Sequence, residues 1–424
     1  MNPFTPAQLR PIAQTHGTPL WVYDAATIRE RIASLKSFDV IRYAQKANSN
    51  LQVLRLMREQ GVRVDAVSLG EIERAQAAGY DSADPQPPGE APKAGAHAAG
   101  LVLTADLLDQ ATLARVVADG IPVNAGSIDM LRQLGATSPG HRVWLRINPG
   151  FGHGHSNKTN TGGEHSKHGI WHGDLEEALG VIRATGLHLV GLHMHIGSGV
   201  DYSHLAQVCG AMVDLVARVN LPIEAISTGG GLSIPYRPGE TRIDVAHYFG
   251  LWDAARQRIQ AARGHAITLE IEPGRYLVAE SGVLVSEVRA VKKQGHQHFV
   301  LVDAGFNDLM RPSMYGAHHG IQLLPSDDAP RASVPTVVGG PLCESGDVFT
   351  QGDGGVVLTR ELPAAKVGDL LVFEDAGAYG ASMSSNYNSR PLIPEVLVDG
   401  GQARLIRRRQ TMQELLALEL DLAH

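Results

Sequence analysis

Four short polar motifs attract attention because each follows directly on an apolar run. They are Tyr43-Ala44-Gln45-Lys46, His193-Met194-His195-Ile196-Gly197-Ser198, Gly229-Gly230-Gly231 and Glu272-Pro273-Gly274-Arg275. Lysine can attack a carbonyl carbon, histidine can move a proton or face a flat ligand, and glycine lets backbone amides approach a phosphate. In an α/β barrel the carboxyl ends of all strands meet at one mouth. We therefore expect the four motifs to share a single pocket.

The elements that must position these motifs are visible as a regular alternation. Apolar runs that predict strands cover residues 40–45, 62–67, 101–104, 121–125, 143–148, 189–196, 225–228 and 268–271. Apolar residues at spacings of three and four predict helices between them, at 51–60, 71–78, 107–118, 175–184, 204–219 and 246–262. Eight strand–helix units in roughly 240 residues match the size of a (β/α)8 TIM barrel. Closure is not visible in the pattern, so an open doubly wound sheet is the alternative.

The period of the apolar residues changes to two after residue 276. Residues 283–291 alternate, and so do residues 395–407 around the hairpin motif Asp399-Gly400-Gly401-Gln402. This half predicts a C-terminal β-domain, a sandwich or barrel-like sheet, closed by a short helix at 411–420. Residues 81–100 are rich in Pro, Gly and Ala, which predicts a surface insertion.

Composition excludes several classes of protein. The chain has 424 residues, which favours two domains, and its net charge of −7 argues against a general nucleic-acid binder. No apolar run approaches the ~20 residues of a membrane span, and the start lacks the pattern of a signal peptide. Only two cysteines are present, Cys209 and Cys343, which favours a reducing compartment. We therefore expect a cytoplasmic protein that does not bind membranes or nucleic acid.

Lys46 and the last two motifs suggest a covalent cofactor with an anionic tail. A lysine inside a barrel mouth loses water, and this desolvation favours the neutral, nucleophilic amine. The loops after the seventh and eighth strands of many barrels bind phosphate through backbone amides. Gly229-Gly230-Gly231 and Gly274 stand at these two places, and Arg275 could add a charge-assisted bond.

The histidines allow a different interpretation, a zinc hydrolase. His193 and His195 alternate along one strand, and a loop carries five more histidines, at His153, His155, His165, His168 and His172. A metal would need further ligands on neighbouring strands, and no such set is evident. One histidine facing a flat cofactor explains His195 with fewer assumptions, so we predict no metal.

Two segments of the β-domain have compositions unlike a core. Gly340-Pro341-Leu342-Cys343-Glu344-Ser345-Gly346-Asp347 places a cysteine in a turn-rich acidic stretch. Residues 377–388 form a long polar loop, and such loops in compact domains are often functional.

Together these segments closely resemble the diaminopimelate decarboxylases, pyridoxal-phosphate enzymes with an alanine-racemase-like barrel. The resemblance covers nearly the whole chain, from about Pro19 to the C-terminus. The barrel motifs alone are also similar to those of ornithine and arginine decarboxylases. The segment from Cys343 to Asp347, together with Arg311-Pro312-Ser313-Met314-Tyr315, narrows the resemblance to the diaminopimelate enzymes.

The resemblance implies an activity and a set of roles. It implies decarboxylation of meso-2,6-diaminopimelate to L-lysine and CO2, the last step of lysine biosynthesis, with pyridoxal 5'-phosphate as the cofactor. Lys46 would form the imine with the cofactor, His195 would stack on its ring, and Glu272 would pair with its ring nitrogen. The implied cofactor site also includes Asp65, Arg146, Ser198, Gly229, Gly230, Gly231, Gly274, Arg275 and Tyr379.

The resemblance also implies how the substrate is recognised. Residues that would bind it are Arg275, Arg311, Tyr315, Glu344 and Tyr379. Cys343 would donate the final proton, and Lys46 is the alternative donor. Cys343 and Glu344 would come from the partner subunit, so that a homodimer shares its active sites. The implied domains are a barrel at 29–275 and a β-domain made of 1–28 and 276–424.

Two departures and two alternatives accompany this interpretation. A phenylalanine common in the family is His168 here, and the stretch 81–100 matches little of the family. Another barrel decarboxylase, acting on ornithine, arginine or carboxynorspermidine, is the main alternative. A pyridoxal-phosphate carrier without catalytic activity is the other, although that class typically lacks a large β-domain.

Overall fold

The computed structural model describes residues 2–82, 99–152, 162–195 and 202–420, which divide into two compact units. The barrel unit contains Arg31–Ser233 and Arg242–Tyr276. The β-unit contains Met1–Glu30, Ile234–Thr241 and Leu277–His424. The short segment Ile234–Thr241 interrupts the barrel in sequence yet folds with the β-unit, which no sequence pattern predicted.

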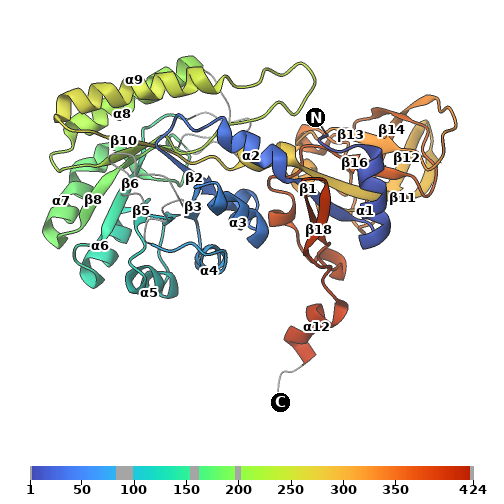
Figure 1. The fold of residues 1–424 in the computed structure, drawn as a ribbon, viewed down its shortest axis with the longest axis horizontal. Coiled ribbons are helices and arrows are strands. Elements are labelled where there is room, and N and C mark those ends of the chain that lie inside the picture. The colour runs from blue at the N-terminus through green and yellow to red at the C-terminus, as the bar shows by residue number, and fades with distance from the viewer. Residues whose placement is uncertain (1, 83–98, 153–161, 196–201, 421–424) are drawn as a thin grey trace. The chain divides into compact units, whose positions relative to one another are not determined.

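Eight parallel strands of the barrel unit close into a ring (Figure 1). Their order around the ring is β2 (Val40–Ala44), β3 (Arg63–Ala66), β4 (Leu101–Ala105), β5 (Val123–Ala125), β6 (Arg142–Asn148), β8 (His188–His193), β9 (Ala225–Ser227) and β10 (Thr268–Ile271). A two-residue strand, β7 (Ile170–Trp171), pairs with β6 outside the ring. The pairing of β10 with β2 closes the sheet, with Glu270 opposite Val40. Each predicted strand is present, so the TIM barrel is confirmed and the open sheet is excluded.

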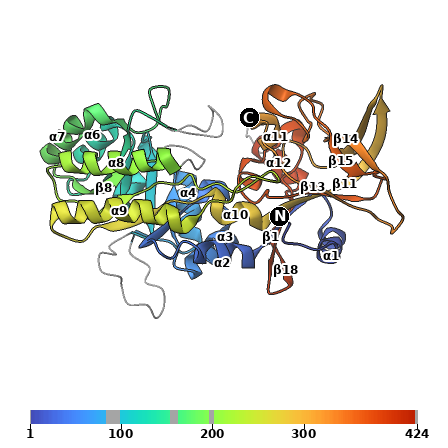
Figure 2. The same ribbon diagram turned by 90° about the horizontal axis from the view of Figure 1, so that it is seen from above.

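Helices lie outside this ring, as Figure 2 shows. They are α2 (Ala25–Ala33), α3 (Leu51–Glu59), α4 (Leu69–Ala77), α5 (Gln110–Ala118), α6 (Ile128–Thr137), α7 (Leu175–Thr185), α8 (Tyr202–Arg218) and α9 (Val245–Arg263). Short polar side chains begin several of them: the Ser68 hydroxyl accepts from the amide of Glu71 and the Asp109 carboxylate from that of Thr112. These caps end the loops at the barrel mouth and set the direction in which each helix returns.

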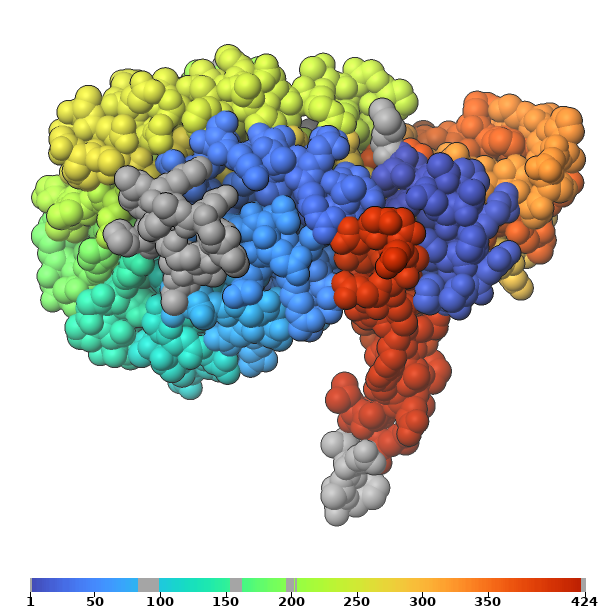
Figure 3. Space-filling view, viewed as in Figure 1, coloured from blue at the N-terminus to red at the C-terminus, as the bar shows by residue number. Residues whose placement is uncertain are grey.

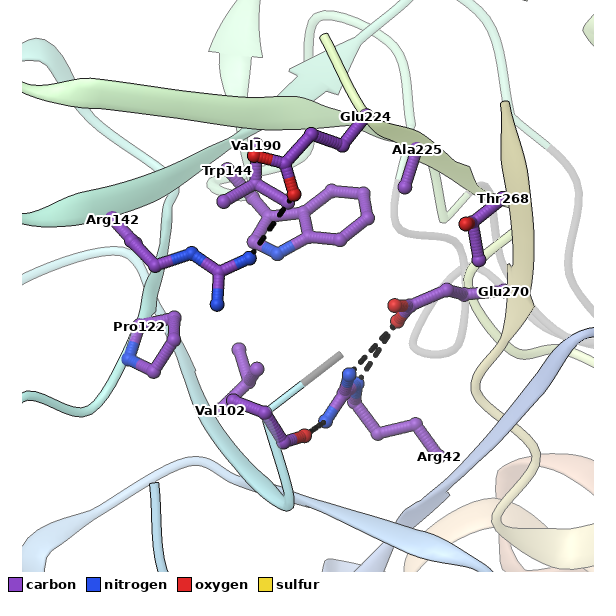
Figure 4. Close-up of a pocket in the computed structure, with 11 residues that line it drawn as sticks. Arg42, Val102, Pro122, Arg142, Trp144, Val190, Glu224, Ala225, Thr268 and Glu270 are labelled. Atoms are coloured by element: carbon purple, nitrogen blue, oxygen red, sulfur yellow. Dashed lines mark hydrogen bonds and ion pairs between the residues drawn. The ribbon is translucent and has the colours of Figure 1, made fainter. Parts of the chain in front are cut away.

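The opposite, amino-terminal end of the barrel contains a small hollow. It is lined mostly by residues near the strand starts, which are Arg42, Ala99, Val102, Pro122, Arg142, Trp144, Val190, Glu224, Ala225, Thr268 and Glu270. Both arginines in it face a glutamate: Arg42 donates twice to Glu270 Oε2, at 3.0 and 3.1 Å, and Arg142 once to Glu224 Oε2 (Figure 4). Because these charges are paired, and because this end of a barrel serves stability rather than chemistry, we assign the hollow to the barrel base.

The β-unit is built on a nine-stranded sheet. Its main path runs β15 (Arg360–Pro363), β14 (Ser333–Gly339), β12 (Gln297–Val302), β11 (Gly282–Gln294), β1 (Leu20–Asp24), β17 (Glu395–Asp399) and β18 (Gln402–Arg407); β13 (Ile321–Leu324) pairs with β16 (Leu370–Phe373), which pairs with β11. The first strand of the chain thus lies between two late strands, which places the N-terminal segment in this unit. Helix α1 (Pro6–His16) contributes Leu9 and Ile12 to the core beneath the sheet.

The last described residues are mostly exposed. The hairpin of β17 and β18 turns at Gly400 and Gly401, both with positive φ, as its glycine pair predicts. Helix α12 (Met412–Leu420) follows and belongs to the red part of the chain in Figure 3. The side chains of Leu418 and Leu420 are largely exposed. Two short helices, α10 (Arg275–Val278) and α11 (Arg311–Tyr315), carry predicted site residues. Among the described helices, none is both long and apolar enough to span a membrane.

Candidate active site

The chain ends of β8, β9 and β10 lie close together at the barrel mouth because the turn after β9 is made of glycines. A Cβ on Gly229 would lie 2.5 Å from the carbonyl oxygen of Met194, and one on Gly230 would lie 2.3 Å from that of Glu272. Gly229 also has φ of +62°, which favours glycine. The amide of Glu272 donates to the carbonyl of Gly229 at 2.8 Å. The glycine motif therefore brings His195 and Glu272 beside each other.

Glu272 is a buried carboxylate held from two sides. Nε2 of His193 donates to its Oε2 at 2.7 Å, and the hydroxyl of Ser227 donates to its Oε1 at 3.1 Å. Burial acts to raise its pKa, but the charge and hydrogen bond of His193, the charge of Arg42 and the bond from Ser227 together lower the pKa to about 2. Glu272 is therefore an anion throughout the neutral range.

Asp65, at the end of β3, behaves in the opposite way. It is 3% exposed, and its Oδ1 has no hydrogen-bond partner among the described residues. Burial, followed by the negative charge of Glu272, holds the pKa of Asp65 well above its usual range. Two carboxyl groups whose pKa values are pushed apart are typical of sites that handle protons.

His195 is a neutral imidazole. Its Nδ1 accepts a hydrogen bond from the amide of Gly230 at 3.0 Å, so any ring proton is on Nε2. Burial, and after it the positive charges of Arg146 and Lys46, holds the pKa of His195 well below its usual range. An uncharged, flat ring at the barrel mouth is suited to stacking.

Lys46 lies in the turn that follows β2, in the short 3-10 helix Gln45–Ala47. Burial raises the pKa values of both Asp65 and Glu71, and the positive charge of Lys46 partly opposes these shifts, which places the amine in their electrostatic surroundings. The residue is exposed, however, so the expected loss of water around its amine is wrong for this structure. Gly274 packs directly on this turn, because a Cβ there would lie 3.2 Å from the carbonyl of Ala44.

The glycine amides are less available to an anion than their sequence implies. The amide of Gly229 donates to the hydroxyl of Ser227, and that of Gly230 to His195. Gly231, with φ of +102°, Gly274, Arg275 and Tyr379 are the other predicted phosphate-binding residues among those that the structure describes. Ser198 and its neighbours Ile196 and Gly197 lie outside the described residues.

Arg146 and His168, the departure from the family, both interact with the carboxylate of Asp106. Arg146, on β6, is buried, and this burial lowers its pKa although Asp106, Glu272 and Asp65 act against the shift. Nδ1 of His168 lies 2.5 Å from Oδ2 of Asp106, whose Oδ1 accepts from the amide of Gly169. His168 thus anchors the segment before β7 to the end of β4.

The contacts of the histidines bear on the metal alternative. Because His193 donates to Glu272 and His195 accepts from Gly230, the two rings do not point at a common ion. Within the described ranges, no group of three or more His, Cys, Asp or Glu side chains is arranged to hold a metal. His153 and His155 are not among the described residues.

In the β-unit, Arg311 is buried and its guanidinium is held on two sides. One of its nitrogens donates to Nε2 of His319 at 2.8 Å, and its guanidinium carbon lies 4.7 Å from the ring centre of Tyr236. Tyr315, four residues on in the same helix, is half-buried. The helix is tied to the cysteine turn, because the hydroxyl of Ser313 donates to the carbonyl of Gly346.

Cys343 and Glu344 lie on the exposed side of that turn. The buried carboxylate of Asp347 organises the turn from within, accepting from the amides of Leu342 and Phe306, each at 2.8 Å. The amide of Cys343 donates to Oδ1 of Asn388 in the polar loop. The two side chains with proposed chemistry are thus presented outward on a rigid support.

Tyr379 is a non-glycine residue with φ of +58°. Its turn is fixed to the segment after α10, since the amide of Gly377 donates to the carbonyl of Ala279 at 3.0 Å. A backbone held in this sparsely populated region is found often at ligand-binding sites.

Three functional residues were missed at the level of sequence. His193 and Ser227 hold Glu272, and His319 holds Arg311. His193 was considered from the sequence only as a zinc ligand; its place beside His195, on the same face of a strand, could also have indicated a role at the cofactor site. The other two contacts join distant parts of the chain and leave no local pattern.

Comparison with known proteins agrees with this geometry. The model of a pyridoxal-dependent decarboxylase, pyridoxal binding domain, matches residues 25–279, more than half of the chain. Diaminopimelate decarboxylase of Escherichia coli (strain K12) is 66% identical over 407 residues, covering 95% of this chain and 94% of the relative.

Solved structures give the same result. One crystal structure of diaminopimelate decarboxylase has a TM-score of 0.92 and 63% identity, covering 98% of this chain and 96% of the other. The enzyme from Helicobacter pylori complexed with L-lysine has a TM-score of 0.83 and 30% identity, covering 97% and 99%. On these grounds, the chain belongs to the diaminopimelate decarboxylase family of pyridoxal-dependent decarboxylases.

Proposed function

We propose that this protein decarboxylates meso-2,6-diaminopimelate to L-lysine and CO2 with pyridoxal 5'-phosphate as its cofactor. The observation that carries the proposal is the presence, on strand ends that lie close together at the barrel mouth, of an anionic Glu272, held by His193 and Ser227, and a neutral His195, held by Gly230. A pyridoxal ring needs an anion at its nitrogen and a flat neighbour on its face, and the two side chains meet both needs. The family membership and the 66% identity to the Escherichia coli enzyme support the same choice.

The residues of the barrel mouth fit this cofactor. Glu272 would hold the ring nitrogen, since an opposite charge favours its protonated form. His195 would cover the ring, and Asp65 and Arg146 would line it. Gly231, Gly274 and Arg275 would hold the phosphate, and we propose that Gly229, Gly230, Ser198 and Tyr379 complete this site. Lys46 would provide the amine that binds the aldehyde.

The reaction needs a place for the electron pair that the departing CO2 leaves behind. When bound, pyridoxal phosphate supplies that place in its electron-withdrawing ring. The work of the chain is to keep Glu272 ionised, which the bonds from His193 and Ser227 achieve, and to keep His195 uncharged, which burial achieves. Both conditions hold at neutral pH.

Substrate recognition is assigned to Arg311, Tyr315 and Glu344, with Arg275 and Tyr379. Guanidinium groups bind carboxylates, and a carboxylate binds the distal amine. Binding of the distal end of the substrate would also fix the orientation of the end that loses CO2. Ornithine and lysine lack one of the two charged ends, so a site built for both discriminates against them.

The final proton is assigned to the thiol of Cys343. Cys343 and Glu344 are exposed on a turn that the carboxylate of Asp347 organises. This exposure supports the proposal that the two side chains enter the active site of a partner subunit. We accordingly propose a homodimer with shared active sites, acting in the cytoplasm on a free amino acid.

A panel of amino acids tests the function. CO2 release and the absorbance spectrum would be measured with meso-diaminopimelate, ornithine, arginine, lysine and carboxynorspermidine. We expect CO2 and L-lysine from meso-diaminopimelate and at least a hundredfold lower specificity constants for the others. Turnover of ornithine but not of meso-diaminopimelate would favour the alternative decarboxylase. A protein that binds the cofactor and releases no CO2 would favour the carrier.

A further inference from the structure

The segment Ile234–Thr241 leaves the barrel in sequence and folds with the β-unit, and its position requires a reason. Its turn is closed by Glu240, whose Oε2 accepts from the amides of Tyr236 and Arg237 at 2.8 and 3.1 Å. Nδ1 of His318 donates to the carbonyl oxygen of Tyr236 at 3.0 Å. The backbone of Tyr236 is therefore held from both sides.

The ring of Tyr236 supports Arg311. The guanidinium carbon lies 4.7 Å from the ring centre, within the range of a cation–π contact. Stacking occupies the flat face of a guanidinium and leaves its N–H groups, which lie in the plane, for hydrogen bonds. Tyr236 therefore sets the plane in which Arg311 can bind a carboxylate.

His319 sets the rotation of Arg311 within that plane. Nδ1 of His319 faces the carbonyl oxygen of Glu374 at 2.9 Å and must therefore carry a proton. Nε2 is then an acceptor, and it receives the N–H of Arg311 at 2.8 Å. The ring is 3% exposed and meets the ring of Tyr236 edge to face, with centroids 5.6 Å apart. An imidazole in this tautomer orients the guanidinium without adding negative charge.

We propose that His319 and Tyr236 are positioning residues that hold Arg311 for the carboxylate that the substrate keeps and the product L-lysine retains. The inference rests on the proposed function, which gives Arg311 its ligand. It also explains why Ile234–Thr241 folds with the β-unit: this segment brings Tyr236 to Arg311.

Matched variants test the two contacts. His319→Leu removes the acceptor, whereas His319→Gln keeps a carbonyl oxygen near the position of Nε2. Tyr236→Leu removes the aromatic face, whereas Tyr236→Phe keeps it. The measurements are KM and kcat for meso-diaminopimelate, the Kd of L-lysine and the cofactor content of the holoenzyme.

We expect His319→Leu to raise KM and the Kd of L-lysine about tenfold, with kcat and cofactor content changed less than threefold. His319→Gln should return both constants to within threefold of the wild type. In an Arg311→Lys background, His319→Leu should have no further effect, because the guanidinium it orients is gone. Should His319→Leu fail to fold, the Tyr236 pair makes the same comparison.

Three results would overturn the inference: His319→Leu with both constants within twofold of the wild type, His319→Gln as impaired as His319→Leu, or additive effects in the Arg311→Lys background. Failure of the proposed function is a separate result, namely wild-type enzyme that releases no CO2 from meso-diaminopimelate. In that case crystal structures of wild type and His319→Leu still decide the positioning, because an unmoved Arg311 guanidinium would reject it.

Discussion

Replacing His193 tests the central electrostatic argument, that a hydrogen bond keeps Glu272 anionic. His193→Leu removes the donor that lies 2.7 Å from the buried carboxylate. A hydrogen bond to a charged group contributes about 1.5–3 kcal/mol, which corresponds to a rise of roughly one to two units in the pKa of Glu272. Because that pKa starts at about 2, Glu272 stays ionised at neutral pH.

The sign of the effect on stability follows from the direction of the shift. The folded-state pKa of Glu272 is below its ordinary value of 4.5, so its contribution to stability is present above pH 4.5 and is lost as the pH falls toward 2. In His193→Leu the folded-state pKa of Glu272 is closer to 4.5, so this contribution is smaller and its loss is complete at a higher pH. Removing one partner of a buried pair also costs on the order of 3 kcal/mol of folding free energy.

The assay is acid unfolding of the apoprotein, followed by circular dichroism, with cofactor affinity measured from about pH 4 to 8, so that the range reaches the raised pKa of Glu272 in the variant. We expect the acid midpoint of His193→Leu to move upward and its cofactor affinity to fall at the acid end first. His193→Gln is the control, because its amide can still donate to Glu272. Superimposable acid transitions of wild type and His193→Leu would refute the reasoning, as would a His193→Gln variant that behaves like His193→Leu.

Three further predictions concern other parts of the molecule. Lys46→Ala should abolish both activity and the visible band of amine-bound cofactor; a purified variant with an unchanged spectrum would contradict the assignment of Lys46. Arg42→Met should lower the free energy of unfolding by about 3–5 kcal/mol, because it leaves Glu270 buried and unpaired, and the double variant Arg42→Met/Glu270→Leu should recover most of the loss in chemical denaturation. Burial raises the pKa of Asp308 from 3.8 to about 7. As the pH rises from 4 to 7, the stability of the wild type should therefore fall relative to that of Asp308→Asn, by up to on the order of 4 kcal/mol. Melting temperatures of the two proteins that change in parallel over this pH range would contradict the prediction.

The barrel was predictable because its evidence is local. Each strand is a run of apolar residues, and in each helix apolar residues recur at spacings of three and four. Residues 40–271 therefore predict eight strand–helix units without any knowledge of contacts. Motifs at strand ends could then be assigned to one mouth, since parallel strands of a barrel all end on the same side. The hairpin at Gly400 and Gly401 was predictable for the same reason, because two glycines with positive φ define the turn.

The state of the side chains was not predictable in this way. Asp65 and Glu272 are both carboxyl groups at strand ends, yet the pKa of one is raised and that of the other lowered. The difference comes from His193 and Ser227, which reach Glu272 from two other strands. The folding of the chain also decides that Lys46 is exposed and that the amides of Gly229 and Gly230 bond to Ser227 and His195.

The sequence by itself therefore determined the fold class and the family, and it predicted several of the residues at the barrel mouth. Tertiary structure alone decided which of those groups are charged, which amides are already engaged, and that Ile234–Thr241 brings Tyr236 to Arg311. The physical reason is the separation along the chain of the residues that interact. Periodicity and turn chemistry act between near neighbours in the chain, whereas burial, charge and hydrogen bonding depend on groups that only the folded chain brings together.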